Sequence, residues 1–488
     1  MSFVSGATMR SIEEAAFRRG IAAEHLMNLA GEGIARRLVD QFPSPGRAVA
    51  YVGKGNNGGD ALVALKHLRQ AGWQISVKAG FPETEWGVLP RRKLRELESP
   101  PGPDIPSGKG PLLLLDGLLG IGGRGPLRPP LAGLAAEMTA LRDERGAIIA
   151  AMDLPSGLDA DTGEGAALVA DLTLTVGVPK SGLATPAGIS HSGRIVAVPL
   201  DDLPPPENTA LRFFCPESFP GLLPPRPHGF HKGRAGRLGI LAGSPGMTGA
   251  AVLVATAALR AGAGLVTLHV GRDFLPSLAS AMPAEVMVLP SDHPVEDAFA
   301  ANHDARVIGP GTGNCGETWR ASLLDKLATS DVPAVLDADA LNLIASSGRL
   351  ELLASHHLIT PHPGEFGRLA PDLGELDRFA AASAFVARHP GTLLLKGART
   401  LVAARNIPVR FNPTGHAGMA SGGQGDALAG VAGALLAGGL PGPDAASLAA
   451  WLCGRAGERA LGASGIVTAG DTINHLGGAM RDWRECRR

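Results

Sequence analysis

The sequence predicts an α/β protein of two domains, each built around a parallel sheet. With 488 residues the chain is too long for one compact core, since a domain usually has roughly 100–200 residues. Short apolar runs alternate with longer segments of helical periodicity, which is the pattern of parallel strands joined by crossover helices. A proline-rich stretch, 203–230, interrupts this alternation. We therefore expect a first domain over 1–205, a linker or strap over 206–230 and a second domain over 231–488.

The first domain is expected to begin with two amphipathic helices within 9–39, followed by alternating strands and helices. Apolar runs of strand length are separated by segments in which apolar residues recur at helical spacing. The expected strands are 47–53, 74–80, 111–116, 147–153, 171–178 and 194–200, and the expected helices between them are 60–72 and 131–141.

The second domain restarts the alternation at residue 237. The uncharged run 238–259 is as long as a membrane span, but GSPG (243–246) interrupts it, so strand, loop and helix explain it better. The expected strands are 237–243, 265–270, 306–311, 332–339, 357–360 and 392–398, and the expected helices are 249–261, 426–437, 443–462 and 470–484.

Composition argues against several classes of protein. The chain has 45 Lys+Arg and 46 Asp+Glu residues, so it lacks the cationic excess of a nucleic-acid-binding protein. Its four cysteines form neither a C-x-x-C pair nor a dense disulfide set, which fits a reducing compartment. The first residues, MSFVSGATMRSIEE, lack the apolar core of a signal peptide. We expect a soluble cytoplasmic protein that binds neither nucleic acid nor a membrane.

The segment GKGNNGGD, 53–60, directly follows an expected strand and precedes an expected helix. Its glycines let the backbone approach an anion, and the helix N-terminus supplies unpaired N–H groups and the positive end of a dipole. It cannot be aligned with G-x-x-x-x-G-K-[ST], so it is not a Walker A loop. The pattern favours a phosphate or pyrophosphate ligand over a plain strand–helix turn.

Two further loops, DGLLGIGGRGP (116–126) and DLPSG (153–157), also follow expected strands. The first contains G-x-G-x-x-G, but the prolines behind it do not open a helix as a dinucleotide fingerprint requires. Because the carboxyl ends of parallel strands share one edge of a sheet, we expect four oxygen-bearing side chains at one rim: Asn57, Asp116, Asp153 and Ser156. Their oxygens suit a monovalent or divalent cation beside a proton-transfer site. Each aspartate taken singly could instead cap a helix.

Loops of the second half outline another cleft. GPGTG (309–313), DADALN (337–342) and TPHPGEF (360–366) each follow an apolar strand. KGART (396–400) adds two cationic side chains beside them. Each loop alone could be only structural, but together they favour a ligand site.

The strongest signal is SGGQGDALAGVAGALLAG, 421–438, a glycine-rich loop followed by an uncharged helix. The glycine N–H groups and the helix dipole suit a polyphosphate, and Asp426 at the helix start can take a proton from a hydroxyl that attacks phosphorus. Its alternative role is helix N-cap. Among the histidines, His362 is the best functional candidate, because a zinc site at His228 and His231 would lack a third ligand.

Together these motifs resemble those of the bifunctional NAD(P)H-hydrate repair enzymes. The first half resembles the NAD(P)H-hydrate epimerase domain through LMNLAG, GNNGGD, DGLLGIGG and DLPSG. The second half resembles the ADP-dependent NAD(P)H-hydrate dehydratase through HKGRAGR, TGAAVL, GPGTG, DADALN, TPHPGEF, LKGA and GGQGDALAG. The resemblance implies a Rossmann-like three-layer α/β/α domain and a ribokinase-like α/β domain. It also implies that the R and S hydrates are interconverted and that the S hydrate is dehydrated at the expense of ADP, giving AMP and phosphate.

The resemblance implies roles for individual residues. Catalytic roles would fall on Asp116, Asp153 and Asp426. Contacts with the hydrate would fall on Asn56, Asn57, Gly58, Gly59, Asp60, Gly120, Ile121, Gly122, Gly123, Arg124, Gly125, Pro126, Asp153, Ala250, Gly311, Gly313, His362 and Asp426. Contacts with the nucleotide would fall on Lys396, Gly397, Ala398, Arg399, Thr400 and Gly425. Potassium would be held by Asn57, Asp116 and Ser156, and Mg²⁺ would accompany the ADP.

Two positions depart from the family pattern. GIGG stands where the epimerase often has GTG, and Gln424 stands where the dehydratase usually has threonine, which leaves the phosphate contacts open. A ribokinase-like vitamin kinase would also use GGQGD, although it leaves the first half unexplained. The first half could instead be a non-catalytic binding module, although Asn57, Asp116 and Asp153 are all present. We expect a homo-oligomer with small-molecule substrates.

Overall fold

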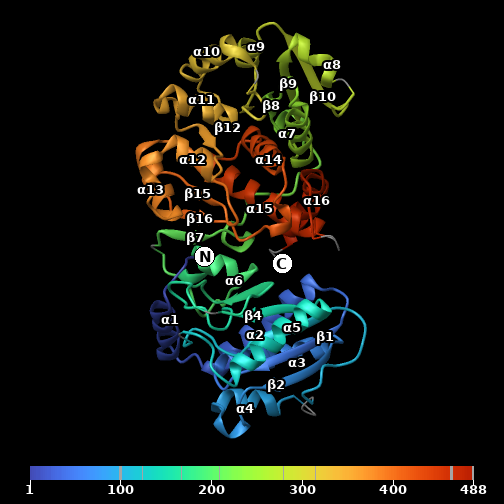
Figure 1. The fold of residues 1–488 in the computed structure, drawn as a ribbon, viewed down its shortest axis with the longest axis vertical. Coiled ribbons are helices and arrows are strands. Elements are labelled where there is room, and N and C mark those ends of the chain that lie inside the picture. Colours follow the sequence, from blue (N-terminus) through green and yellow to red (C-terminus); the bar gives the residue numbers. More distant parts are fainter. Residues whose placement is uncertain are drawn as a thin grey trace. The chain divides into compact units, whose positions relative to one another are not determined.

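The chain folds into two compact units, Met1–Thr209 and Ala210–Arg488. The computed structural model describes residues 1–97, 102–123, 125–165, 167–207, 209–278, 280–313, 315–461 and 465–485. Each unit holds one sheet with helices packed against it, coloured from blue to green in the first unit and from green to red in the second (Figure 1). The predicted α/β class is therefore confirmed.

The first unit places a parallel sheet between helices. Its elements, short 3₁₀ turns aside, are α1 (Gly6–Arg18), α2 (Ala23–Gln41), β1 (Arg47–Val52), α3 (Asn56–Gln70), β2 (Gln74–Ala79), α4 (Val88–Arg95), β3 (Leu112–Gly117), α5 (Leu131–Arg145), β4 (Ile148–Met152), β5 (Leu172–Val176), α6 (Pro186–Ser192) and β6 (Arg194–Val198). The strand order is β2-β1-β3-β4-β5-β6, and every pair is parallel. The order reverses between β1 and β3, and ligands of such sheets bind beyond the strand ends at this point.

Alternate residues of β1 enter two different hydrophobic cores. Ala48, Ala50 and Val52 pack with residues of α2 and α3, whereas Val49 and Tyr51 pack with residues of α5. The side chains of a strand point alternately to its two faces, so both faces of this sheet are covered. All five residues are fully buried. The first unit is therefore a three-layer α/β/α structure.

The second unit is built on a ten-stranded sheet. Its elements, short 3₁₀ turns aside, are β7 (Leu211–Phe213), β8 (Arg237–Leu241), α7 (Thr248–Ala261), β9 (Leu265–Gly271), α8 (Leu275–Leu278), β10 (Val286–Ser291), α9 (Pro294–Ala300), β11 (Ala305–Ile308), α10 (Gly316–Leu327), β12 (Ala334–Leu336), α11 (Asp339–Ser347), β13 (His357–Ile359), α12 (Pro363–Leu369), α13 (Arg378–Arg388), β14 (Thr392–Leu395), β15 (Leu401–Ala403), β16 (Val409–Phe411), α14 (Gln424–Ala437), α15 (Gly442–Ala460) and α16 (Ala469–Glu485).

The ten strands follow the order β10-β9-β8-β11-β12-β13-β14-β15-β16-β7. Strand β15 is antiparallel to both of its neighbours, and the other pairs are parallel. Strand β7 comes from the proline-rich stretch and pairs with β16. This part of the segment 206–230 thus belongs to the second sheet.

Helix α14 lies in the centre of the second unit's core. Every residue from Ala427 to Ala437 is buried, as is typical of a helix that is apolar on all sides. Each fully buried Leu or Val contributes about 1.5–3 kcal/mol to stability. Gly430 permits close packing on α7, because a Cβ there would lie 2.3 Å from the carbonyl oxygen of Val254. The same packing fixes the N-terminal end of α14, where Asp426 lies.

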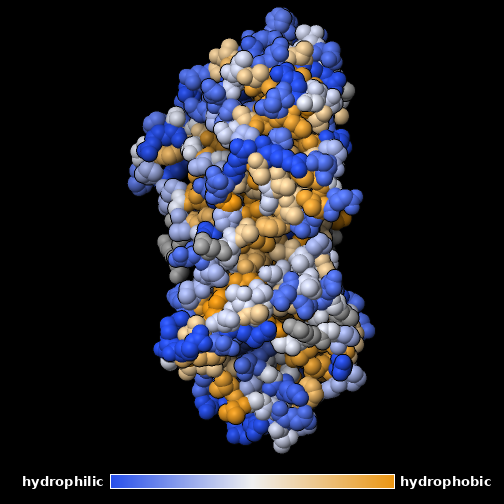
Figure 2. Space-filling model, turned by 90° about the vertical axis from the view of Figure 1, so that its left-hand side faces the viewer, coloured by the Kyte–Doolittle hydropathy of each residue, from blue (hydrophilic) through white to orange (hydrophobic). Residues whose placement is uncertain are grey.

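The large apolar side chains that stay exposed lie on helices α1 and α4, on strand β10 and in loops. In Figure 2, hydrophilic side chains lie between the apolar patches that are visible on each unit. Among the described residues, no helix combines the length and the apolar composition needed to cross a bilayer. The exposed residues are Phe17, Val88, Val169, Met247, Met287, Leu289, Leu376, Leu461 and Ile466.

Candidate active sites

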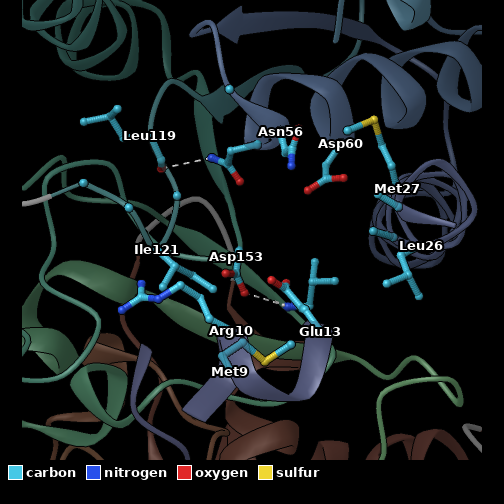
Figure 3. Close-up of a pocket in the computed structure, with 18 of the residues that line it drawn as sticks. Met9, Arg10, Glu13, Leu26, Met27, Asn56, Asp60, Leu119, Ile121 and Asp153 are labelled. Carbon is cyan, nitrogen blue, oxygen red and sulfur yellow. Dashed lines mark hydrogen bonds between the residues drawn. The ribbon is translucent and has the colours of Figure 1, made fainter. Parts of the chain in front are cut away.

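The first unit has a cavity of about 500 Å³ beyond the ends of β1, β3, β4 and β5. In Figure 3, Asn56 and Asp60 lie on one side of this cavity, and Glu13 and Asp153 lie on the other. Arg124 lies outside the described residues. Gly125 and Pro126 follow it on an exposed part of the loop. The predicted residues that line the cavity are Asn56, Asn57, Asp60, Gly120, Ile121, Gly122, Gly123 and Asp153.

The motif GNNGGD forms the start of α3. The helix begins at Asn56 with Gly55 as its N-cap, so the first turn presents unpaired N–H groups, as expected of an anion-binding turn. Gly58 and Gly59 pack behind the cavity wall. A Cβ at Gly58 would lie 2.8 Å from the carbonyl oxygen of Gly53, and one at Gly59 would lie 2.6 Å from the sulfur of Met27. These two glycines allow the helix to approach its neighbours.

Asp116 is fully buried at the end of β3. Its carboxylate accepts hydrogen bonds from the Ser156 N–H at 2.8 Å, the Ser156 hydroxyl at 2.5 Å and the Leu118 N–H at 3.3 Å. Burial raises the pKa of Asp116 to about 6, although these hydrogen bonds lower it. The Asn57 amide donates to the Leu119 carbonyl at 3.0 Å, and the Ser156 hydroxyl lies 3.2 Å from the same oxygen. The structure thus brings the three predicted potassium ligands together.

Asp153 lines the cavity and forms an ion pair with Lys180. Lys180 was not among the residues predicted from the sequence. The Lys180 side chain is 1% exposed, and its ammonium also donates to the Val176 carbonyl at 2.8 Å. Asp153 has a φ of +68°, a region that favours glycine. Such strain costs about 1–3 kcal/mol and is concentrated at functional sites. A lysine directly behind the expected strand 171–178 could have been found by the strand-end argument that selected Asp116.

In the second unit, charged side chains from several predicted loops meet at the start of α14. The Lys396 ammonium lies 2.8 Å from Asp337 Oδ1 and 3.8 Å from Glu365 Oε2. A Cβ built at Gly425, next to Asp426, would lie 3.4 Å from the Lys396 nitrogen. Burial, and then the charge of Asp337, raise the pKa of Asp426 to about 6, although Lys396 partly offsets the increase. Asp337 and Glu365 lie in the predicted motifs DADALN and TPHPGEF, but neither was predicted as a site residue.

The alternative role of Asp426 as a helix N-cap is wrong. The N-cap of α14 is Gly423, which has a φ of +85°, and Asp426 is the third residue of the helix. A glycine suits this N-cap because its φ lies in the left-handed region. Asp426 is therefore free of a capping role, and its carboxyl lies where the positive end of the helix dipole acts.

His362 has a clear structural role as the N-cap of α12. Its Nδ1 accepts hydrogen bonds from the N–H groups of Gly364 at 3.0 Å and Glu365 at 3.3 Å. In return, the Glu365 carboxylate accepts from the His362 N–H at 2.9 Å. Half of the His362 side chain stays exposed. The cap therefore fixes Glu365 beside Lys396 and leaves one side of the imidazole accessible.

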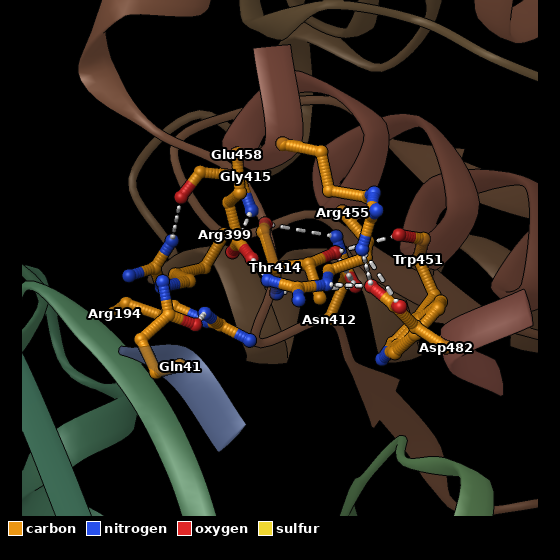
Figure 4. A network of polar contacts seen from close by, with 11 residues as sticks. Gln41, Arg194, Arg399, Asn412, Thr414, Gly415, Trp451, Arg455, Glu458 and Asp482 are labelled. Carbon is orange, nitrogen blue, oxygen red and sulfur yellow. Dashed lines mark hydrogen bonds and ion pairs between the residues drawn. The ribbon is translucent and has the colours of Figure 1, made fainter. Parts of the chain in front are cut away.

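In the segment Lys396–Thr400, the Lys396 side chain points to Asp337, whereas that of Arg399 points to Gly415. Arg399 is buried, and its guanidinium donates to the carbonyl of Gly415 at 3.4 Å. Figure 4 shows the network around this loop, in which Glu458 accepts from the Gly415 N–H at 3.0 Å and from Arg455 at 3.0 Å. The guanidinium of Arg399 thus supports a neighbouring loop.

The GPGTG loop packs against the start of α7. A Cβ at Gly311 would lie 2.8 Å from the Cβ of Ala250, and one at Gly313 would lie 3.3 Å from the Asp339 carboxylate. A Cβ at Gly309 would lie 2.0 Å from the Asp337 carbonyl oxygen, so the loop also touches the charged cluster. A second cavity, of about 410 Å³, lies beside this loop beyond the ends of β8, β9 and β10.

Comparison with known proteins accounts for both units. The family model described as NAD(P)H-hydrate dehydratase matches residues 238–476, and the model described as YjeF-related protein N-terminus matches residues 23–182. The bifunctional NAD(P)H-hydrate repair enzyme Nnr of Gloeobacter violaceus is 36% identical over 486 residues, covering 94% of this chain and 93% of that protein. The Nnr of Coxiella burnetii is 34% identical over 494 residues, covering 96% and 97%. This chain belongs to the family of bifunctional NAD(P)H-hydrate repair enzymes.

A solved structure supports the fold of the second unit. A ribokinase-like superfamily protein of Enterococcus faecalis V583 matches with a TM-score of 0.51 and 24% identity, covering 57% of this chain and 99% of that protein. The similarity shows the fold alone. It agrees with the ribokinase-like fold that the family resemblance implies for the second half.

Gln424, which departs from the family's usual threonine, is held by α16 and the segment before it. Its amide oxygen accepts from the Thr472 hydroxyl at 3.0 Å, and its amide nitrogen donates to the Val467 carbonyl at 3.1 Å. The side chain therefore ties the first turn of α14 to α16.

Proposed function

We propose that this chain repairs hydrated NADH and NADPH in two successive reactions. The first unit would interconvert the R and S hydrates. The second unit would dehydrate the S hydrate to NADH or NADPH while ADP is converted to AMP and phosphate. The observation that carries the proposal is the match to bifunctional repair enzymes over both units. Buried or partly buried acidic side chains beyond the strand ends of each unit support it, with Asp116 and Asp153 in the first and Asp337 and Asp426 in the second.

In the epimerase site, the N-terminus of α3 at Asn56–Asp60 would bind the phosphates of the hydrate. The Gly120–Pro126 loop and Asp153 would contact its ring. A set of oxygen ligands that suits potassium comes from the side chains of Asn57, Asp116 and Ser156 and from the Leu119 carbonyl. When bound, potassium would supply positive charge beside the anionic substrate.

In the dehydratase site, Asp426 would take the proton of the hydrate's hydroxyl as that oxygen attacks the terminal phosphorus of ADP. A new P–O bond forms, the bond to AMP breaks, and AMP leaves with its electron pair. Phosphate then leaves the ring with the C–O electrons, and the neighbouring carbon loses a proton, which restores the double bond. Ala250, Gly311, Gly313 and His362 would contact the hydrate.

Lys396 would neutralise the charge that develops on the transferred phosphoryl group. The backbone of Lys396–Thr400 and the Gly425 N–H would contact the nucleotide. Within the described part of the chain, no group of three or more His, Cys, Asp or Glu side chains is arranged to hold a metal ion. We therefore propose that Mg²⁺ arrives with ADP and is bound mainly by phosphate oxygens.

The test is incubation of chemically hydrated NADH with ADP and Mg²⁺ while the nicotinamide absorbance is followed. We expect ADP-dependent recovery of NADH from the S hydrate, and recovery from the R hydrate after epimerisation. Equal rates with and without nucleotide would contradict the dehydratase. A vitamin kinase joined to a non-catalytic module would instead phosphorylate a hydroxymethyl substrate and leave the ratio of the two hydrates unchanged.

A further inference from the structure

The N-terminal segment of the chain is fastened to the loop that carries Lys180. Val4 and Lys180 form an isolated parallel bridge. The Val4 N–H donates to the Pro179 carbonyl at 2.9 Å, and the Ser181 N–H donates to the Val4 carbonyl at 2.8 Å. Helix α1 begins directly behind this bridge. The position of α1 is therefore fixed by these backbone contacts with the Lys180 loop as well as by the packing of its apolar face.

Helix α1 directs one row of side chains into the cavity of the first unit. Met9, Glu13 and Phe17 line it, and their spacing of four residues places them on one face of the helix, with Arg10 beside them. Figure 3 shows Met9, Arg10 and Glu13 on the side of the cavity where Asp153 lies. The matched epimerase model begins at residue 23, so this row lies outside it.

Asp153 is held as the partner of a buried ammonium group. Three donors converge on one of its oxygens, Oδ1: the Lys180 ammonium, the Val176 N–H at 3.0 Å and the Thr175 hydroxyl at 3.4 Å. The side chain is 10% exposed. These three donors bind one oxygen of the carboxylate and so orient its second oxygen.

Glu13 reaches the same cavity from helix α1. Burial raises the pKa of Glu13, the Asp153 carboxylate raises it further, and Lys180 and Arg10 partly offset the increase. The ionisable groups that face it are Arg10 on its own helix, Asp60 on α3, Asp153 behind β4 and Lys180 behind β5. A carboxyl group of raised pKa that shares a cavity with a carboxylate held by hydrogen-bond donors is a common basis of an acid and base pair.

We propose that Glu13 is the proton donor and Asp153 the proton acceptor of the epimerisation, with Lys180 as the residue that positions Asp153. The inference rests on the proposed epimerase function and names the side chains that perform it. Helix α1 therefore contributes a side chain to the active site in addition to its packing role.

The chemistry requires one donor and one acceptor on the same ring. Asp153 takes the proton of the hydroxyl, a C=O bond forms, and the bond from that carbon to the ring nitrogen breaks. The electron pair passes to the nitrogen, which takes the proton of Glu13. Closure on the opposite face reverses each transfer, so both side chains return to their starting states and no other reactant is consumed.

Asp60 is the competing donor. Burial raises its pKa well above the ordinary value, and the carboxylates of Asp153 and Glu13 raise it further. It lies across the cavity from Asp153, at the start of α3, where we place the substrate phosphates. We assign the donor role to Glu13 because α1 is fastened to Lys180 and brings Glu13 to the side where Asp153 lies.

The test compares Glu13→Gln with Glu14→Gln, a control at the neighbouring exposed position on α1. The initial rate of R-to-S conversion is measured on purified R hydrate, with the spontaneous rate subtracted. We expect Glu13→Gln to lower kcat by about 10²–10⁴-fold at little change in KM, because positioned proton transfer contributes that much. Glu14→Gln should match the wild type. The ADP-dependent rate on S hydrate should be unchanged in both, and the thermal unfolding of the full chain should match the wild type, which shows that the first unit is folded.

The pH profile separates a proton donor from a structural residue. The wild-type kcat should fall as pH rises through the pKa of Glu13, and Glu13→Asp should keep this limb while Glu13→Gln loses it. Lys180→Arg should retain much more activity than Lys180→Met, since the cation that holds Asp153 is kept. If Glu13→Gln stays within threefold of the wild type while Asp60→Asn is inactive, the donor is Asp60 and the inference is overturned. A wild-type protein without any epimerase activity would instead refute the proposed function.

Discussion

Asp426 is expected to act in proton transfer and, through its raised pKa, to lower the stability of the fold at neutral pH. We expect Asp426→Asn to lower the ADP-dependent kcat on the S hydrate by about 10²–10⁴-fold, because the variant cannot accept the proton of the hydroxyl. The backbone of α14 should be unaffected, since Gly423 is the N-cap. Steady-state rates check this, with the exposed Asp325→Asn as a control that keeps wild-type activity. A loss of tenfold or less would remove Asp426 from the proton transfer.

The raised pKa of Asp426 also predicts how stability depends on pH. Its pKa is about 6 in the folded chain because of burial and then Asp337, whereas an unfolded aspartate titrates at about pH 4. Between these values the folded state binds more protons than the unfolded state, so stability falls as pH rises from about 4 to about 6. Asp426→Asn should therefore raise Tm above pH 6 and not below pH 4. Thermal unfolding at a series of pH values measures this, and a difference that does not vary with pH would contradict it.

Asp116 tests whether the two sites are independent. We expect Asp116→Ala to abolish use of the R hydrate without an equal loss on the S hydrate, because Asp116 belongs to the first unit alone. Each buried donor that loses its acceptor costs about 1–3 kcal/mol, so Asp116→Asn is the second variant in case the first unit unfolds. Initial rates on separated R and S hydrates decide the outcome. Equal impairment on both epimers would mean that the sites are coupled.

Residues within strand-end motifs were predictable, whereas those delivered by tertiary contacts were not. Asn57, Asp116 and Ser156 were expected at one rim because parallel strands end at one edge, and the structure joins them through hydrogen bonds. Glu13 comes from a helix whose periodicity predicts only an amphipathic face. Its place on the same side of the cavity as Asp153 depends on the bridge between Val4 and Lys180, and no local pattern in the sequence indicates that bridge.

Among the elements, α14 offers the sharpest test of close packing. A Cβ at Gly430 would lie 2.3 Å from the Val254 carbonyl oxygen, a backbone atom that cannot rotate away. We expect Gly430→Ala to destabilise the second unit by about 1–3 kcal/mol through overpacking. The control is Gly477→Ala within α16, where a Cβ meets nothing within 4 Å, so the higher helix propensity of alanine should stabilise by up to about 1 kcal/mol. Urea unfolding midpoints measure both, and equal shifts would show that α7 and α14 can separate.

Long elements were predicted better than short ones. The helices expected at 426–437, 443–462 and 470–484 correspond to α14, α15 and α16, because each carries several turns of apolar spacing. Strands β12 and β13 have three residues each and lie within the expected strands 332–339 and 357–360. Strands β7, β15 and β16 are equally short and were not expected. Their pairing depends on distant parts of the chain, as when β7 joins β16.

At the scale of the whole molecule, the boundary between the two units depends on which hydrophobic core the proline-rich stretch packs into. Strand β7 pairs with β16, and Phe213 and Phe214 are both 1% exposed. Phe214 belongs to the same hydrophobic cluster as Trp483 of α16. A cut between the units must therefore fall before β7, near residue 209, because a later cut would take these aromatic rings from the second core.

We predict that separate expression of residues 1–209 and 210–488 gives two folded fragments, because each retains its own sheet and hydrophobic clusters. Residues 218–488 should be far less stable, since truncating a buried phenylalanine costs roughly 3–5 kcal/mol and this fragment lacks two of them. Circular dichroism and urea unfolding compare the two versions of the second unit. The fragment 210–488 should keep ADP-dependent activity on the S hydrate, and 1–209 should keep exchange between the hydrates. If 1–209 is unfolded while 218–488 is as stable as 210–488, the proline-rich stretch serves the first core and the boundary drawn at 209 is wrong.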